Sequence, residues 1–390
     1  MKRKIEVYED RDGNILAKNG DMIATAAGYG LEWDQDADAY RRIGDSNYIL
    51  IQEKMRRCTV LDNGEVNYYL DAYDSTKKAD GDDAVLDGTD GQVMVEIPAF
   101  YYKYSFTEGS KHRYMLSEVK LGGYELHPAF ILEGKEVGKR YMGAYDAEVV
   151  DDKLCSISGT YPYCGKTIGE YRTYARNRGA DWFQQDYNLT FAVQLLAMIE
   201  YGTMNLQSAL GDGRTQLSGG TWEDGSYYGQ SGLSNNRGNR SGNVEYSGDA
   251  DDDGADAAYM SYRGIENLYG NVWNMVDGVK FNDYVPYISN TPSEWSDELT
   301  SDYVSTGIKQ STRKGYGRQL APTGAGMFIS SVSGGSTSAG TTDYYYQNSG
   351  LRILLVGAGA NDGLKAGAWG LLCNWAASHS YASVGARLVR

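Results

Sequence analysis

Histidine is scarce in this 390-residue chain, which contains only His112, His127 and His379. Three widely separated histidines disfavour a histidine-based catalytic triad or a histidine metal cluster. The four cysteines form no Cys-x-x-Cys pair and show no metal-ligand spacing. The sequence therefore indicates neither a zinc site nor a disulfide framework, and a reducing compartment or a virion suits it.

Two common catalytic motifs are also missing. The chain has no G-x-S-x-G nucleophile elbow. Gly165-Lys166-Thr167 resembles the end of a phosphate-binding loop, but Thr160 stands where that loop needs its first glycine. We therefore predict no catalytic residues, no cofactor and no metal site.

Long apolar runs are absent as well. No run approaches the length of a membrane span, so we expect none. The N-terminus has basic residues without an apolar segment behind them, which predicts synthesis in the cytoplasm without a secretory signal. The net charge of −15 argues against a nucleic-acid or anionic-membrane partner, because both need a basic surface.

What the chain does have is a distinctive C-terminal segment. Of the 31 residues from 357 to 387, 17 are Gly, Ala or Ser, with a few large polar and aromatic residues among them. Small residues bury little apolar area, so we do not expect a core strand or helix there. Apolar runs at 351–356 and 384–389 enclose the segment. We predict two buried strands that hold a binding surface between them, although such composition is also typical of plain loops.

The rest of the chain suggests two parts. Residues 1–90 alternate short apolar runs with acidic, turn-rich stretches, which indicates a β-rich module and linker. A strong strand signal broken by Pro98 opens residues 91–390, the predicted ligand-binding domain. Within it we expect helices at 168–178 and 189–210, and long loops at 218–248 and 330–350.

One acidic stretch was weighed as a calcium loop. Asp249 to Gly254 fits the D-x-D-x-D-G opening of such a loop, but Met260 occupies the position of the bidentate glutamate. We therefore favour a solvated acidic loop over a calcium site.

Two segments carry a family resemblance. Gly270-Asn271-Val272-Trp273-Asn274-Met275 resembles the G-N-V-W-E-W segment of the formylglycine-generating, sulfatase-modifying family, and Gly385-Ala386-Arg387-Leu388-Val389 resembles its G-F-R-Φ-V ending. That resemblance implies an α+β fold class with a C-type lectin-like domain, preceded here by a small β-rich N-terminal module. The family's enzymes use a pair of C-terminal cysteines to hold copper, whereas this chain has only Cys373 there, so we predict that it is not an enzyme.

The chain is more similar to variable proteins of diversity-generating retroelements, including phage tropism determinants. In addition to the segments above, Gly28 to Asp34 and the spacing of small residues between Ala360 and Leu388 resemble these proteins. In such a family an error-prone reverse transcriptase rewrites adenine-containing codons at exposed positions of a C-terminal variable region, here about 357–387. The resemblance implies these variable, ligand-contacting positions: Gly359, Asn361, Asp362, Leu364, Lys365, Ala368, Gly370, Leu372, Asn374, Trp375, His379, Tyr381 and Ser383. It implies these fixed scaffold positions: Gly363, Gly367, Ala376, Ala377, Ser378, Gly385 and Arg387.

These observations predict a diversified ligand-binding protein of a phage tail or bacterial cell surface. Its partners would be a protein or glycan receptor on a target cell, and a particle or tail component bound through the N-terminal module. A homo-oligomer, possibly a trimer, would add avidity. Two alternatives stay open: an undiversified structural or lectin component of a tail fibre or adhesin, and a copper-dependent oxidase of the formylglycine-generating type.

Overall fold

The computed structural model describes residues 7–9, 15–17, 22–24, 28–44, 49–217, 228–246 and 257–390. The chain is mostly β: 36% of it lies in strands and 13% in helices. The described part contains four α-helices, and none of its sheets closes on itself. The expected α+β class, with its lectin-like domain, was therefore wrong, because residues in short strands far outnumber those in helices and the strands form open sheets.

The largest sheet has eight strands and includes Trp273 to Met275 of one segment that carries the family resemblance and Gly385 of the other. Its order along the hydrogen-bonded path is β23 (Val304–Ser305), β22 (Val285–Ile288), β21 (Trp273–Asn282), β28 (Leu351–Gly357), β29 (Gly367–Cys373), β27 (Tyr344–Gln347) and β24 (Gly315–Tyr316), with β30 (Val384–Gly385) parallel to β21. Residues 330–350, expected to be a loop, thus contribute β27, which pairs parallel to β29.

Two further sheets combine strands from both sides of residue 90. The six-stranded sheet has the order β17 (Phe183–Gln184), β31 (Leu388–Val389), β14 (Lys139–Gly143), β8 (Gln92–Pro98), β6 (Arg56–Val60) and β7 (Val66–Tyr69). The five-stranded sheet has the order β11 (Glu125–Leu126), β9 (Tyr101–Thr107), β10 (Lys111–Ser117), β4 (Tyr29–Asp34) and β5 (Ala39–Ile43). Strands before and after Asp90 therefore share hydrogen bonds, as β6 and β8 do.

The remaining strands form small sheets. The three-stranded ones are β1 (Val7–Glu9), β2 (Ile15–Ala17) and β3 (Met22–Ala24), and β18 (Gly242–Tyr246), β19 (Ala257–Tyr262) and β20 (Ile265–Glu266). The two-stranded ones are β12 (Ile131–Leu132) with β13 (Lys135–Glu136), β15 (Glu148–Val150) with β16 (Lys153–Cys155), and β25 (Gln319–Leu320) with β26 (Ile329–Ser331).

Three of the four helices in the described part of the chain begin at a side-chain cap. In α2 (Ile168–Arg176), Thr167 and Glu170 form a reciprocal capping box, so the helix predicted at 168–178 is confirmed. The helix predicted at 189–210 is two helices, α3 (Tyr187–Tyr201) and α4 (Leu206–Leu210). Gly202 separates them because it adopts a left-handed conformation with φ 71°, which ends α3. The fourth helix is α1 (Leu50–Glu53).

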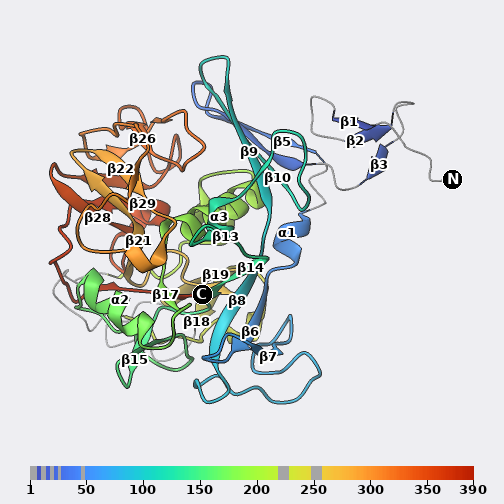
Figure 1. Cartoon of the computed structure of the whole chain (residues 1–390), viewed down its shortest axis with the longest axis vertical. Helices are drawn as coiled ribbons and strands as arrows, with labels where there is room; N and C mark the ends of the chain where they lie inside the picture. Colours follow the sequence, from blue (N-terminus) through green and yellow to red (C-terminus); the bar gives the residue numbers. More distant parts are fainter. Residues whose placement is uncertain are drawn as a thin grey trace.

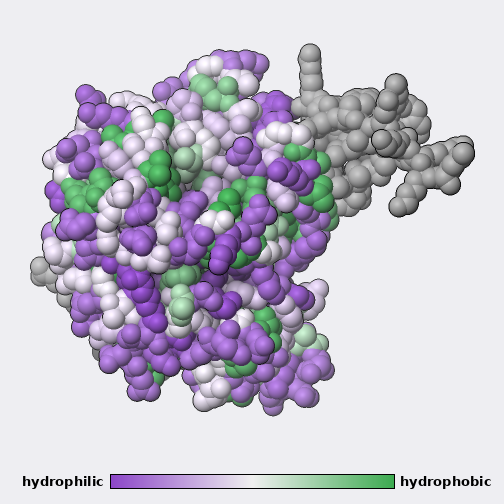
Figure 2. Space-filling view, in the orientation of Figure 1, coloured by the Kyte–Doolittle hydropathy of each residue, from purple (hydrophilic) through white to green (hydrophobic). Residues whose placement is uncertain are grey.

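The core forms around α3, which is buried from Tyr187 to Ile199. Figure 1 shows α3 in the middle of the molecule, and the helix contacts β21 on one side and β4 on the other. A helix that is apolar on every face must be covered on every face. The face of the molecule in Figure 2 is mostly hydrophilic, with apolar residues in small separate patches.

Candidate functional site

The C-terminal segment is built on a β-hairpin. Strands β28 and β29 pair antiparallel, and the 358–366 loop joins them. After β29, the 374–383 segment leads back to β21, where β30 pairs parallel with Trp273 and Asn274. Both flanking apolar runs are in strands, as predicted, although the second is divided into β30 and β31.

Strand β29 corrects the expectation that this segment holds no core strand. All seven of its residues are buried. Trp369, Leu371, Leu372 and Cys373 supply the apolar area, while the small residues allow close approach of neighbouring groups. A Cβ on Gly367 would lie 2.0 Å from Oδ2 of Asp343, so no other residue fits there without displacing Asp343.

Asp343 is a buried carboxylate next to this strand. It accepts hydrogen bonds from the backbone N–H of Trp369 at 2.8 Å and from Oγ1 of Thr342 at 3.1 Å. Burial raises the pKa of Asp343 well above its ordinary value, and these two donors only partly oppose the rise. The carboxylate thus fixes the start of β29 at an electrostatic cost.

Trp273 connects the 358–366 loop to the 374–383 segment. Its indole Nε1 donates to Oδ2 of Asp362 at 2.9 Å, and its backbone N–H donates to the carbonyl of Ser383 at 3.1 Å. Asp362 also accepts from the backbone N–H of Gly359 at 2.8 Å. Burial raises the pKa of Asp362, while these two donors and Lys365 oppose the rise. One residue of the 270–275 motif therefore holds both parts of the C-terminal segment.

A second buried centre fastens the end of the chain. Arg387 pairs with Asp146 at 2.7 Å, and both side chains are 2% exposed. Arg387 also donates to the carbonyls of Gly143, Glu266 and Asn267 at 2.9 to 3.0 Å. Burial raises the pKa of Asp146, and the Arg387 guanidinium is the largest opposing influence.

The 270–275 motif completes this centre. The side-chain amides of Asn271 and Asn274 donate to Asp146 at 3.0 and 3.1 Å. Both segments that carry the family resemblance therefore meet at a single carboxylate.

Three aromatic side chains of the 374–383 segment lie together. The ring centroids of Trp375 and Tyr381 are 4.3 Å apart, and those of Trp375 and His379 are 6.0 Å apart. Trp375 is buried against the core that includes Ile353 and Leu372, whereas His379 is exposed and Tyr381 is half-buried. The cluster thus has a buried anchor and an accessible edge, an arrangement suited to contact with a ligand.

The predicted ligand-contacting positions differ in exposure. The exposed positions are Asn361, Leu364, Lys365 and His379. The half-buried positions are Asp362, Asn374 and Tyr381. The buried positions, which a ligand cannot reach in this conformation, are Gly359, Ala368, Gly370, Leu372, Trp375 and Ser383. Among the exposed set, Leu364 is 53% exposed and lies in a 3-10 turn, Gly363–Lys365.

The predicted scaffold positions are mostly less exposed. Gly367, Gly385 and Arg387 are buried, and Gly363, Ala376 and Ala377 are half-buried. Gly363 adopts φ 56°, a conformation that favours glycine. Ser378 differs because it is exposed, so its surroundings give no packing reason for it to stay fixed.

Cys373, the cysteine considered for copper chemistry, is buried in β29. Burial raises the pKa of its thiol well above the ordinary value. Within the described residues, no three His, Cys, Asp or Glu side chains lie close enough together to hold a metal ion. The acidic stretch 249–254 lies outside the described residues, whereas Met260, at the twelfth position of the candidate calcium loop, lies in β19.

Sequence reasoning missed Asp146 and Asp343. Neither belongs to a recognisable motif, and Asp146 lies 241 positions from its partner Arg387.

No helix among the described residues is long and apolar enough to cross a membrane. No protein-family model matches the sequence, and no curated protein matches it at a significant level.

Proposed function

We propose that this chain is a ligand-binding protein that presents its C-terminal segment to a protein or glycan receptor on a target cell. One observation carries the proposal: exposed side chains project from a backbone that buried bonds hold in place. Leu364 and Lys365 project from the 358–366 loop, and His379 projects from the 374–383 segment. Trp273 is bonded to both of these stretches.

A rigid backbone favours binding because less conformational entropy is lost when a ligand orders the surface. Exposed positions also tolerate replacement, since surface substitutions away from special contacts change stability by about 0.5 kcal/mol or less. Specificity can then change through Leu364, Lys365 and His379 while the fold stays intact. Asp362 is a poorer candidate for variation because it holds Trp273.

This separation of exposed and fixed positions is what a diversity-generating retroelement needs. We therefore propose that the codons of the exposed positions are its targets, and that the protein acts on a phage tail or bacterial surface. Attachment through the N-terminal module and assembly into a homo-oligomer, possibly a trimer, would turn weak single contacts into avidity.

The decisive test is genetic. We expect the DNA downstream of the gene to contain a near-copy of the segment that encodes residues 356–388, differing at adenines and lying beside a reverse transcriptase gene. Sequencing the 3′ end of the gene across a population should then show changes at the exposed codons and none at Trp273 or Arg387. An invariant 3′ end without such a copy would contradict diversification and favour an undiversified adhesin or tail component.

A further inference from the structure

A cavity of about 340 Å³ lies away from the predicted ligand-contacting positions. Its walls come from the β12–β13 hairpin, from β14 and β17, and from the residue after β31, Arg390. The volume is near the lower end of the range of about 300 to 1,000 Å³ that small-molecule sites occupy. The function proposed for the C-terminal segment does not involve this cavity.

One part of the cavity wall is apolar. Tyr141 and Phe183 are buried, and Leu132 and Val137 are half-buried on the hairpin side. Such a surface favours an apolar group of a few carbon atoms, because contact removes that group from water.

Cationic side chains line another part, and two of them are already neutralised. Arg140 is 1% exposed and donates to Asp186 at 2.8 Å, to the carbonyl of Ala129 at 3.0 Å and to that of Arg390 at 3.0 Å. Lys139 pairs with Glu96 at 2.6 Å. These contacts fix the cavity floor but leave little charge for a ligand.

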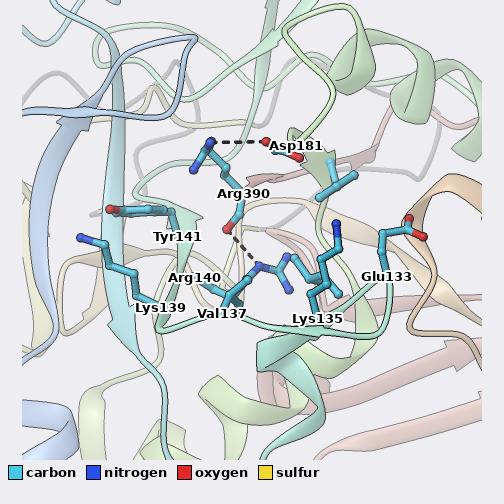
Figure 3. A pocket seen from close by; sticks show the side chains of 10 residues that line it. Glu133, Lys135, Val137, Lys139, Arg140, Tyr141, Asp181 and Arg390 are labelled. Atoms are coloured by element: carbon cyan, nitrogen blue, oxygen red, sulfur yellow. Dashed lines mark hydrogen bonds and ion pairs between the residues drawn. The ribbon is translucent and has the colours of Figure 1, made fainter.

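Two other cations line the cavity: Arg390, which faces Asp181 at 3.6 Å, and Lys135. The ammonium of Lys135 is the more accessible of the two. Lys135 is exposed on β13, and no hydrogen bond or ion pair joins its ammonium to another residue in the described part of the chain. In Figure 3 its side chain extends from the hairpin toward the end of the cavity formed by Arg390 and Asp181. An ammonium group in that position can donate hydrogen bonds to the carboxylate of a bound molecule.

Two carboxylates also line the cavity, and they make a purely anionic ligand a poor fit. Glu133 accepts from the backbone N–H of Ser293 and points away from the other labelled side chains in Figure 3. Asp181 lies at the Arg390 end, 3.6 Å from Nη2 of that residue, and its side chain is 79% exposed. A long, exposed ion pair of this kind is weak, so Asp181 can pair with a cation of the ligand instead.

We infer that this cavity binds a small zwitterion with an apolar side chain, of the class of a free α-amino acid. The ligand carboxylate lies at Lys135, its ammonium at Asp181, and its side chain against Phe183 and Val137. This assignment accounts for both signs of charge and for the apolar wall. It is independent of the function proposed for the C-terminal segment.

The test is a titration of the full chain with L-leucine, followed by calorimetry or ligand-observed NMR in the millimolar range. Leucinamide, which lacks the carboxylate, and N-acetyl-L-leucine, which lacks the ammonium, are the matched probes. Each should bind about tenfold or more weakly than leucine, because each loses one charged hydrogen-bonding group. Lys135→Gln and Asp181→Asn should each weaken leucine binding by a similar factor.

The controls are Lys120→Gln and Asp80→Asn, two exposed positions that do not line the cavity. Both should bind leucine as the unmodified chain does, and all variants should keep its melting temperature. Failure of leucine and L-phenylalanine to bind overturns the inference. Equal binding of leucine and N-acetyl-L-leucine overturns the zwitterion assignment, and full binding by Lys135→Gln shows that the site lies elsewhere.

Discussion

The indole Nε1 of Trp273 donates a hydrogen bond of 2.9 Å to the carboxylate of Asp362. Trp273 belongs to β21 and Asp362 to the loop after β28, so this bond joins two stretches that are 89 positions apart. Asp362 lies between exposed positions, with Asn361 before it and Leu364 shortly after it. One partly buried contact therefore sets the path of a loop that also carries exposed side chains.

Replacing Asp362 should destabilise the protein. Asp362→Ala removes the acceptor for Trp273 and for the Gly359 N–H, and we expect a loss of about 2 kcal/mol in the free energy of unfolding. Asp362→Asn keeps one acceptor oxygen and should lose less. Urea denaturation measures both. Leu364→Ala, at a side chain 53% exposed, is the control and should stay within about 0.5 kcal/mol. An Asp362→Ala protein as stable as that control would refute the role of the bond.

Arg387 should matter more to the stability of the protein than Arg352 of β28. Arg387→Ala leaves Asp146 buried without its cation, and breaking a buried pair in this way costs about 3 to 5 kcal/mol. Arg352→Ala is the matched control because Arg352 is half-buried and donates to the carbonyl of Ser349. Chemical denaturation of the two variants should show a large loss for Arg387 and a small one for Arg352. Equal losses would mean that the Asp146 centre does not stabilise the fold.

The pH dependence of the protein's stability should reveal the raised pKa of Asp343. The pKa of Asp343 is raised in the folded protein, so between its unfolded value of about 3.9 and its folded value the folded state binds more protons. Asp343 therefore contributes a loss of stability as the pH rises through that interval. Asp343→Asn removes this loss. The stability of the variant, relative to that of the unmodified chain, should therefore increase from acidic to neutral pH.

The measurement is thermal unfolding across the pH range from about 4 to 8. Other buried carboxyls, including Asp146 and Asp362, also have raised pKa values, so the difference between variant and unmodified chain is the relevant quantity. The exposed Asp80 provides the control substitution, Asp80→Asn, whose profile should parallel that of the unmodified chain. A parallel profile for Asp343→Asn would contradict the raised pKa.

Local signals in the sequence predicted local structure well. The apolar run at 351–356 became β28, and Thr167 with Glu170 begins α2 as a capping box. The same signals could not reveal which strands pair. Strand β29 is buried despite its small residues because β27 and Asp343, distant in sequence, pack against it. The fold class was wrong for the same reason, since pairing of many short segments decides it.

The close packing of the 357–387 segment was predictable from the sequence, but the exposure of its individual positions was not. Small residues indicated a closely packed backbone between 357 and 387, and the structure has one. Leu372 and Ser383, however, are buried by neighbours that the local sequence pattern does not predict. Asp146 shows the limit most clearly, because only the folded chain brings it to Arg387.

Substitutions within the aromatic cluster should affect either ligand binding or stability, depending on the residue replaced. His379→Ala removes an exposed ring and should weaken labelling of target cells by the protein while leaving its melting temperature unchanged. Trp375→Ala removes a side chain only 8% exposed and should cost about 3 kcal/mol of stability. Flow cytometry with the cells that the unmodified protein labels, alongside thermal unfolding, measures the two effects. The ring centroids of His379 and Trp375 are 6.0 Å apart, so the two substitutions change neighbouring side chains of one surface. If His379→Ala, Lys365→Ala and Leu364→Ala all label these cells as strongly as the unmodified chain, the ligand contacts another part of the molecule.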